Sequence, residues 1–452
     1  MKNTLKKIGL LLLGGVLLTV AGCEKFLDVK SDQRLTVPET LADAQAMIDY
    51  SQITTTGFSQ VAEISTDDYY LTDADYNSLS KDFDKAAYTW SDYEVFGGST
   101  NQWSSTYMGV NTSNTVLDLV QRRSDGSAAW NDIKGRALVF RGMRFMDALF
   151  THSIAYDPAT ASSALGIPLR LDPDFNRPSV RSSVAEGYAQ VINDLKTAIP
   201  LLSPISSTPV RPSRCAAYGL LARVYLTMRE YANAALYADS ALSLKNSLID
   251  YNTLRAADAY PIKELNSEVV LVAYMPYTDP LAVNRARINE ALYASYAAED
   301  LRRSIFFAVN ANGTKTFKGG YTGTPNYLFS LNTDELYLIR AEGMARQGRV
   351  AEALADVNKL LENRYKKGTF VPRTGSDRTA VLEVVLAERR KELLMRGLRW
   401  MDIKRLNLEG RGIEMQRVVN GKAYQMRPND PRYAIALPND VIALSGMPQN
   451  PR

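Results

Sequence analysis

Apolar residues recur at helical spacing in many segments of this chain, and long stretches rich in Tyr, Asp, Asn, Gly and Thr separate those segments. The two longest such stretches are residues 54–100 and 247–332, and no linker rich in Pro, Gly or Ser divides the 452 residues. This pattern predicts a mostly α-helical protein whose second half is rich in loops and has few short strands. Loops held on a rigid scaffold often bind ligands, so both stretches are candidate ligand surfaces.

One helical pattern occurs twice, 119 positions apart. Residues 221–242 align without a gap to residues 340–361, and each copy predicts two helices joined by a three-residue turn. Ala222 and Ala341 coincide where the two helices of a pair should cross, and small residues allow a close crossing. Alanine-rich helix pairs are typical of tetratricopeptide repeats, which must stack to bury their apolar faces. Further helix pairs are predicted at 101–124 with 130–154 and at 181–200 with 213–228.

The first 22 residues have the pattern of a bacterial export signal. Three lysines precede an apolar run at residues 8–18, which is shorter than the roughly 20 residues of a membrane-spanning helix. Val20, Ala21 and Gly22 then lead into Cys23, a sequence that resembles a lipobox, so Cys23 is the predicted lipidation site. Two or three acyl chains there would form a stable membrane anchor. The alternative is an ordinary signal peptide cleaved near Ala21, with an unmodified thiol at Cys23.

Charge and two rare residue types exclude several classes of function. Removal of residues 1–22 leaves 50 basic and 49 acidic residues, and a nearly neutral chain argues against nucleic acid or an anionic membrane surface as the partner. His152 is the only histidine, which excludes most Ser-His-Asp triads and multi-histidine zinc sites. Cys215 is the only cysteine besides Cys23, so the exported chain has no internal disulfide. Its helix-like surroundings predict a buried thiol.

Aromatic and polar side chains are dense in residues 66–100. Carbohydrates place their apolar C–H faces on aromatic rings, while their hydroxyl groups need carboxylate, amide or guanidinium partners. Sites for them are therefore concave and mixed in character. A second candidate segment is the Gly-rich loop at 318–326. The predicted ligand-binding residues are Tyr69, Tyr70, Tyr76, Trp90, Tyr93, Phe96 and Tyr321.

These assignments have structural alternatives. Trp90 either stacks on a ligand at the surface or packs in the core, because Trp side chains are usually largely buried. The glycines of loop 318–326 either let the backbone approach a ligand closely or form a tight turn with positive φ. Trp103 is expected to be structural, since it lies at the predicted start of a helix.

Two charged motifs have functional interpretations that we do not adopt. The run at 388–392 alternates in charge, and its leucine neighbours give it helical periodicity, so internal ion pairs between helix and loop are expected. Asp67 and Asp68 are oxygen ligands of the kind that calcium prefers, but two adjacent carboxylates lack a fuller coordination set. We therefore predict no metal and no cofactor.

A series of motifs occurs in order from one end of the chain to the other. The motifs are residues 23–28 (Cys-x-x-Phe-Leu-Asp), 103–107, 111–114, 136–145, 216–226, 334–342, 388–405, and 437–439 with 449–451. In this order they resemble the SusD/RagB family of nutrient-binding outer-membrane lipoproteins of Bacteroidetes. The resemblance implies about four tetratricopeptide-like helix pairs, stacked as a right-handed scaffold that cradles a loop-rich second half.

The resemblance also implies a division of the chain into three parts. Residues 1–22 are the signal peptide, and residues 23–246 are an N-terminal region with helical repeats and ligand-face loops. Residues 247–452 are a C-terminal region that includes a further repeat at 333–364.

The resemblance further implies that this chain is a non-catalytic protein of the cell surface, which a lipid anchors in the outer membrane. Such a protein binds an oligosaccharide and delivers it to a TonB-dependent transporter of the SusC class, over which it sits as a hinged lid. A peptide-binding lid of a RagA-like transporter is the alternative. A surface glycoside hydrolase is a further alternative, which would need two carboxylates in one cleft.

Overall fold

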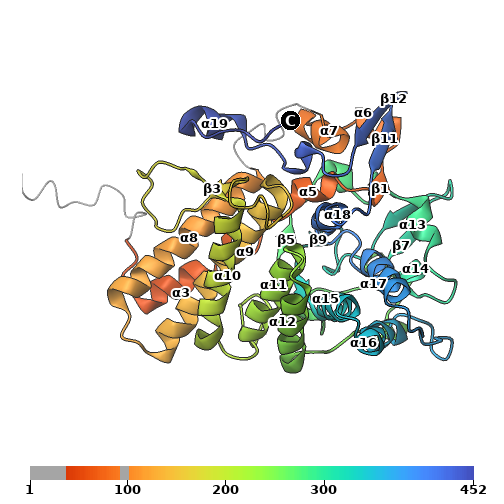
Figure 1. Ribbon diagram of the computed structural model, residues 1–452, viewed down its shortest axis with the longest axis horizontal. Coiled ribbons are helices and arrows are strands. Elements are labelled where there is room, and N and C mark those ends of the chain that lie inside the picture. The colour runs from red at the N-terminus through yellow and green to blue at the C-terminus, as the bar shows by residue number, and fades with distance from the viewer. Residues whose placement is uncertain (1–36, 92–100) are drawn as a thin grey trace, which may run out of the picture.

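The structure of the protein is a computed structural model, which describes residues 37–91 and 101–452. Helices predominate and the strands are short, which confirms the predicted fold class (Figure 1). None of the described helices is both long and apolar enough to cross a membrane. The predicted signal peptide and Cys23 lie outside the described residues.

The long helices form one row of packed neighbours, which runs from α8 to α16 and α17 across the molecule in Figure 1. The bounds confirm the helix pairs that were predicted from apolar spacing, including both copies of the internal repeat. In chain order the members of the row are α3 (Leu41–Asp49), α8 (Gln102–Arg123), α9 (Ala128–His152), α10 (Val184–Ala198), α11 (Arg214–Thr227), α12 (Tyr231–Leu244), α15 (Thr333–Arg346), α16 (Val350–Glu362) and α17 (Arg378–Glu392).

Small residues let these helices cross closely. Ala222 and Ala341 are both fully buried, as their places in the repeat predict. A Cβ atom added to Gly343 of α15 would lie 2.5 Å from the carbonyl oxygen of Tyr231, so α15 meets the start of α12 backbone to backbone. Any larger side chain at such a point would force the two helices apart.

Three side chains satisfy the carbonyl groups at the C-terminal end of α9. The Lys404 ammonium donates to the carbonyl oxygens of Phe150 and Ser153, while Asn450 Nδ2 and Arg181 donate to that of His152. Cationic groups are favourable there because the helix dipole is negative at this end. Burial nevertheless lowers the pKa of Lys404 to about 7. The same contacts fasten the C-terminal segment of the chain to the helical row.

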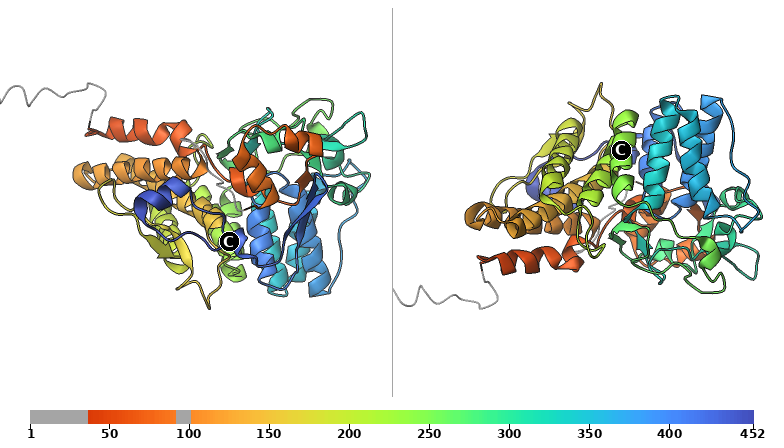
Figure 2. Two further views of the ribbon diagram at one scale, coloured as in Figure 1. Left: turned by 90° about the horizontal axis from the view of Figure 1, so that it is seen from above. Right: turned by 90° about the horizontal axis from the view of Figure 1, so that it is seen from below.

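The remaining residues form short elements that lie beside the row, mostly over its second half (Figure 2). The short helices are α4 (Ser51–Thr54), α5 (Gln60–Ile64), α6 (Asp73–Asn77), α7 (Asp82–Thr89), α13 (Glu290–Ala294), α14 (Arg302–Ile305), α18 (Arg399–Asn407) and α19 (Asn439–Ser445). The strands pair antiparallel, two by two: β1 (Tyr69–Tyr70) with β6 (Arg287–Ile288), β2 (Leu165–Pro168) with β3 (Arg181–Ser183), β4 (Val269–Leu271) with β10 (Leu331–Asn332), β5 (Tyr274–Met275) with β9 (Tyr327–Leu328), β7 (Phe307–Val309) with β8 (Lys315–Phe317), and β11 (Met415–Val419) with β12 (Lys422–Met426).

Buried ion pairs join the row to these short elements. The Arg302 guanidinium, which is fully buried, binds the carboxylates of Glu388 and Glu392 at 2.7 and 2.9 Å. Arg390 of α17 binds Asp67 and Asp68 at 3.0 and 3.1 Å. The charged run at 388–392 therefore forms internal ion pairs between helix and loop, which confirms that prediction.

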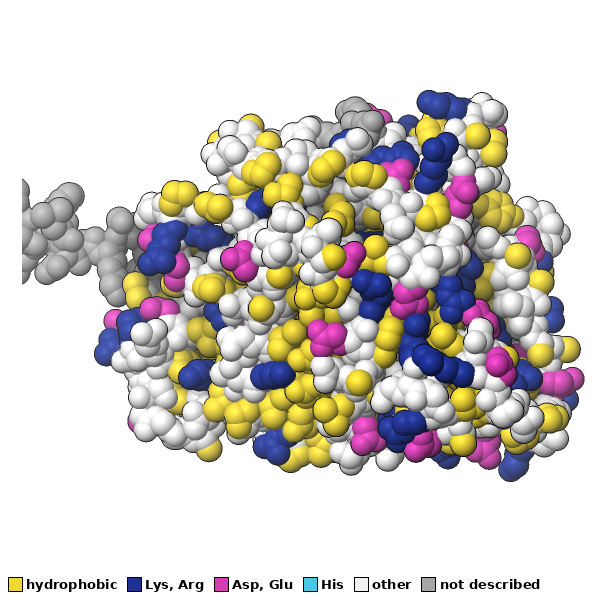
Figure 3. Space-filling view, in the orientation of Figure 1, with side chains coloured by type: hydrophobic (Ala, Val, Ile, Leu, Met, Phe, Trp, Pro, Cys, Tyr) yellow, Lys and Arg dark blue, Asp and Glu magenta, His cyan; other side chains and the backbone are white. Residues whose placement is uncertain are grey.

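An apolar patch covers part of the surface of the row, over α11 and α12 (Figure 3). Leu236 is 58% exposed there, and the rings of Tyr225 and Tyr237 stack with their centroids 5.4 Å apart. Contiguous apolar surface is a common feature of protein–protein contact sites. Cys215 of α11, in contrast, is buried as predicted, and burial raises the pKa of its thiol to about 12.

Candidate ligand-binding groove

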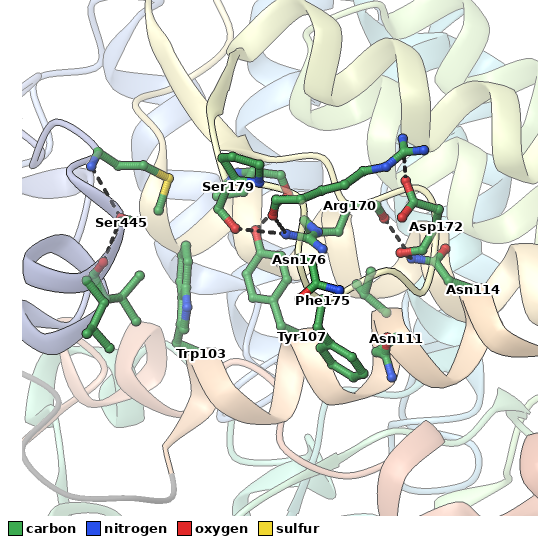
Figure 4. Close-up of a pocket in the computed structure, with 17 residues that line it drawn as sticks. Trp103, Tyr107, Asn111, Asn114, Arg170, Asp172, Phe175, Asn176, Ser179 and Ser445 are labelled. Carbon is green, nitrogen blue, oxygen red and sulfur yellow. Dashed lines mark hydrogen bonds and ion pairs between the residues drawn. The ribbon is translucent and has the colours of Figure 1, made fainter. Parts of the chain in front are cut away.

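An open groove of about 630 Å³ lies between α8, the loop at 168–179 and the segment that carries α19 (Figure 4). This volume is typical of pockets that bind small organic ligands. The three walls come from parts of the sequence that are far apart, and the row of helices holds them together. Figure 2 shows α19 lying close to α8, on the side away from α16.

The first wall is one face of α8. The helix begins at Gln102 because Asn101 and Ser104 form a capping box, in which each side chain accepts a hydrogen bond from the backbone of the other. Trp103 and Tyr107 then lie one turn apart on the same face, with ring centroids separated by 4.7 Å. Asn111 follows one turn further along and also faces the groove.

Trp103 also packs inward. Its ring and that of His152 pack edge to face with their centroids 5.1 Å apart, and it also packs with Leu437 and Met447. These contacts confirm the structural role predicted for Trp103. The same residue lines the groove, a role that the sequence analysis did not assign to it.

The second wall is a loop that hydrogen bonds hold in one shape. Arg170 donates to the carbonyl oxygens of Arg177, at 2.6 Å, and Asp174, and to Ser179 Oγ at 3.2 Å. Successive Asx turns at Asp172 and Asp174 give the loop its curvature. Phe175 lies at its tip with 80% of its surface exposed. An aromatic ring held in water by an ordered loop is a natural platform for an apolar ligand face.

Two side chains of α8 fix the position of this loop. The Tyr107 hydroxyl donates to the carbonyl oxygen of Pro168 at 2.8 Å. Asn114 Nδ2 donates to the carbonyl oxygens of Arg170 and Asp172 at 2.9 and 3.2 Å. The aromatic wall and the loop are therefore set relative to each other before any ligand binds.

The third wall is the segment at residues 437–449, a loop whose two ends are hydrogen-bonded to each other and which carries α19. Leu437 and Gln449 form its base, since the Gln449 amide accepts from the Leu437 N–H at 2.9 Å and donates to its carbonyl oxygen at 2.8 Å. The helix α19 between them has no buried residue, and Leu444 is 89% exposed. Gly446, with φ of +68°, ends the helix in the left-handed conformation.

The groove combines aromatic rings with amide and hydroxyl groups, a composition that suits a ligand with both apolar faces and hydroxyl groups. Asn111, Asn176 and Ser445 lie along it. Asp172 is the one carboxylate among its described lining residues, and it is bound to Arg177 at 2.9 Å. Glycoside hydrolysis uses two carboxyl groups in one cleft, and that pair is not present in this lining.

The aromatic residues predicted from segment 66–100 form a different cluster. Tyr69, Tyr88 and Trp90 surround the guanidinium of Arg417 from β11, whose central carbon lies 3.7 Å from the Tyr88 centroid and 4.7 Å from that of Trp90. Arg417 also donates to the carbonyl oxygens of Ile64, Thr66 and Tyr88. The ring faces thus hold a cation of the protein itself. For Trp90, which is 4% exposed and donates from Nε1 to Ser65, the core-packing alternative describes its main contacts.

A second pocket, of about 450 Å³, adjoins this closed cluster. Tyr69, Tyr70 and Trp90 contribute to its lining, together with the exposed Gln416. Tyr76 is outside that lining and packs against Tyr88 with centroids 5.8 Å apart. Tyr93 and Phe96 lie outside the described residues. Ligand contact by the members of this set stays a prediction.

Tyr321 lies in the interior. Its hydroxyl is hydrogen-bonded to Tyr251, Glu268 and Asp334 at 2.9 to 3.2 Å, and the Arg396 guanidinium covers its ring. Within its loop Gly323 has a φ of +64°, as the tight-turn alternative predicts. The structure therefore separates Tyr321 from both pockets.

Tyr107, Phe175 and Asn111 are not among the ligand-binding residues predicted from the sequence. A local signal did exist for Phe175, because Asp172-Pro-Asp174-Phe-Asn-Arg-Pro is a turn-forming run with one large aromatic residue inside it. No local signal exists for the groove itself, since α19 comes from residues more than 250 positions further along the chain.

Two family models match the chain at separate places. Residues 25–226 match a SusD-like model described as "Starch-binding associating with outer membrane", and residues 306–439 match the model of the SusD family. A curated relative, SusD-like protein P38 of Formosa agariphila, is 31% identical over 139 residues. That match covers 28% of this chain and 25% of the relative, so it spans only a quarter of the relative's length.

Solved structures resemble the whole fold. A SusD superfamily protein from Bacteroides thetaiotaomicron has a TM-score of 0.73 and 21% identity, over 91% of this chain and 100% of that one. A SusD-like carbohydrate binding protein from Bacteroides vulgatus has a TM-score of 0.68 and 19% identity, over 90% and 97%. At these identities the likeness concerns the fold alone.

Proposed function

The chain belongs to the SusD family, and from that membership we propose that it is a glycan-binding protein of the cell surface. The observation that carries the proposal is the groove in which Trp103, Tyr107 and Phe175 lie beside amide and hydroxyl groups. Rings accept the C–H faces of a sugar and the polar groups accept its hydroxyls. The description of one matching family model, and the printed name of one structural relative, both refer to carbohydrate binding.

The protein delivers its ligand, in this proposal, to a SusC-like TonB-dependent transporter. The apolar patch over α11 and α12 offers a surface for a protein partner. Acylation of Cys23 anchors the protein in the outer membrane, and residues 23–246 and 247–452 form its two regions. Fractionation of cells that lack the transporter tests the anchor, since Cys23→Ala should then leave the membrane fraction. Retention of that variant in the membrane would refute it.

The pocket beside the closed aromatic cluster is a second ligand surface in this proposal. Tyr69 and Trp90 are almost completely buried, so a ligand there would mainly contact the half-buried Tyr70 and the exposed Gln416. A peptide cargo is the alternative ligand class. It is distinguished from a glycan by the same titrations, performed with peptide mixtures.

The test is calorimetric titration of the purified protein with a panel of oligosaccharides, together with an assay for newly released reducing ends. We expect binding without release, and weaker binding for Phe175→Ala and Asn111→Ala. The matched control is Tyr50→Ala, which removes an aromatic ring that is 50% exposed elsewhere on the surface. Release of reducing ends would instead favour the hydrolase, and equal effects of the three variants would remove the groove from the proposal.

A further inference from the structure

Arg170 places a positive charge in the wall of the groove without a carboxylate partner among the described residues. Its hydrogen bonds go to two backbone carbonyl oxygens and one hydroxyl group of the loop. These neutral acceptors occupy three of the five N–H groups of the guanidinium and leave its net charge in place. Arg170 is only half-buried, and its remaining N–H groups make no hydrogen bond to the described residues.

Arg181 adds a second positive charge behind the same wall. It donates to the carbonyl oxygens of Gly166, at 2.7 Å, and Pro448, at 3.1 Å, and no ion pair to it occurs in the part of the chain that the structure describes. Burial lowers its pKa to about 10, and the remaining influence on it is the hydroxyl of Tyr107. Arg170 and Arg181 both act electrostatically on Tyr107, which lines the groove.

The carboxylates nearby do not pair directly with these two arginines. Asp172 and Asp174 pair with Arg177, at 2.9 and 3.8 Å, and neither forms an ion pair with Arg170 or Arg181, although Asp172 and Arg177 also line the groove. Arg170 lines the groove, whereas Arg181 is outside its lining and reaches the carbonyl oxygen of Pro448. The pocket beside the closed cluster differs, because Asp67, Glu290 and Glu414 line it together with Arg417.

We propose that the groove is built for a glycan with an anionic substituent, either the carboxylate of a uronic acid or a sulfate ester, which binds at Arg170. This inference rests on the proposed function and names the substrate class within it. A sugar ring that stacks on the exposed ring of Phe175 presents its equatorial substituents sideways, toward the loop. An anion there completes the hydrogen bonding of a guanidinium that now has only neutral acceptors, and charge-assisted hydrogen bonds are about twice as strong as neutral ones.

The test uses protein labelled with ¹⁵N-arginine and follows the Nε–H resonance of Arg170, which is assigned by its absence in Arg170→Lys. The probes are glucuronate, glucose 6-sulfate and glucose, which share one ring and differ in charge. We expect one or both anionic sugars to shift the resonance saturably, with an affinity at least about tenfold above that of glucose. We also expect the affinity to fall with added salt. The better of the two anionic probes identifies carboxylate or sulfate as the substituent.

Two substitutions separate charge from loop structure. Arg170→Lys keeps the charge but not the three hydrogen bonds to the loop, whereas Arg170→Gln loses both. By calorimetry, Lys should retain most of the preference for the anionic sugar over glucose, and Gln should lose about tenfold in affinity for it. Arg122→Gln is the control, since Arg122 is on the same helix as Trp103 and pairs with Asp118 at the surface.

Glucose binding as tightly as the anionic sugars would overturn this inference, and so would no saturable shift with either anionic probe. Equal losses for Arg170→Lys and Arg170→Gln, with glucose affected alike, would assign Arg170 to loop structure only. The proposed function fails separately, if no oligosaccharide of the panel binds in a way that depends on Phe175.

Discussion

Two of the molecule's clusters of aromatic side chains have opposite relations to solvent. In the closed cluster, Tyr69, Tyr88 and Trp90 enclose Arg417 and are almost completely buried. In the groove, the ring of Phe175 is 80% exposed, while the half-buried Tyr107 and the largely buried Trp103, at 7% exposure, form the wall beneath it. Both clusters have the composition of a carbohydrate site, but only the groove has an aromatic side chain, Phe175, that is largely exposed to solvent.

The difference lies in what occupies the ring faces. Arg417 brings a delocalised cation and three hydrogen bonds to backbone carbonyl groups, so it acts as an internal ligand of the closed cluster. In the groove, by contrast, the guanidinium of Arg170 is hydrogen-bonded to the loop and does not cover an aromatic ring. Aromatic composition therefore predicts a stacking site only where no side chain of the protein already fills it. Substitutions in the two clusters should separate stability from affinity.

The largest expected effect is that of Trp90→Ala on stability. Loss of this buried ring, and of its hydrogen bond to Ser65, should lower the free energy of unfolding by about 3–5 kcal/mol. Urea denaturation measures the loss, with Phe175→Ala as the exposed aromatic control. A Trp90→Ala protein with native stability and weakened ligand binding would reverse the comparison and restore Trp90 as a ligand residue.

The next effect concerns pH. Glu63 lies on α5 beside the closed cluster, since the carbonyl oxygen of its neighbour Ile64 accepts a hydrogen bond from Arg417. Burial raises the pKa of Glu63 to about 8. The charge of Asp68 adds to this rise, and the hydrogen bond from the N–H of Gly397 opposes it. Because the unfolded carboxyl titrates near 4.5, the folded protein holds a proton that the unfolded chain releases. Stability should fall as pH rises through this window, by about 3 kcal/mol between pH 4.5 and 7.

Glu63→Gln removes this contribution. The variant should match the native protein near pH 4.5 and exceed its stability by about 3 kcal/mol at pH 7. Urea melts at the two pH values give the difference. A constant gap between the two proteins would mean that Glu63 is not protonated in the folded state.

A smaller effect is expected in the scaffold that holds both clusters. Ala222→Leu or Ala341→Leu adds methylene groups to a fully buried helix contact and should cost about 1–3 kcal/mol. Glu352→Leu, at an exposed position of α16, should change stability by less than about 0.5 kcal/mol. Equal melting of all three variants would contradict the repeat interpretation of residues 213–244 and 333–364.

The smallest effect is that of Phe175→Ala, which should leave the urea melt unchanged. Its loss of affinity for a bound glycan should be about 1 kcal/mol, the range of one aromatic contact. Calorimetry at matched ligand concentration gives this value. An unchanged affinity would place the ligand away from the tip of the loop.

The helix pairs were predictable because their cause is local. Apolar spacing sets them and is visible within a few turns of sequence, and the match of Ala222 with Ala341 shows the same local pattern again 119 positions later. The burial of Trp90 was not predictable from the neighbouring sequence, since Arg417, whose guanidinium lies over its ring, comes more than 300 residues later. For the same reason the groove was missed. Tyr107 gains its role only when the loop at 168–179 and the distant α19 segment fold against it.

The buried thiol of Cys215 has a practical consequence for measuring how the groove moves. A soluble form that begins after Cys23 contains no other cysteine, and a thiol with its pKa raised to about 12 reacts poorly with alkylating probes. The native thiol should therefore not compete with introduced cysteines for a thiol-reactive label. Cysteines introduced at Phe175 and Leu444, both highly exposed, would carry a pair of spin labels on opposite walls. The distribution of distances between the two labels, measured with and without a saturating sugar, would show whether the segment that carries α19 moves toward the loop when a ligand binds.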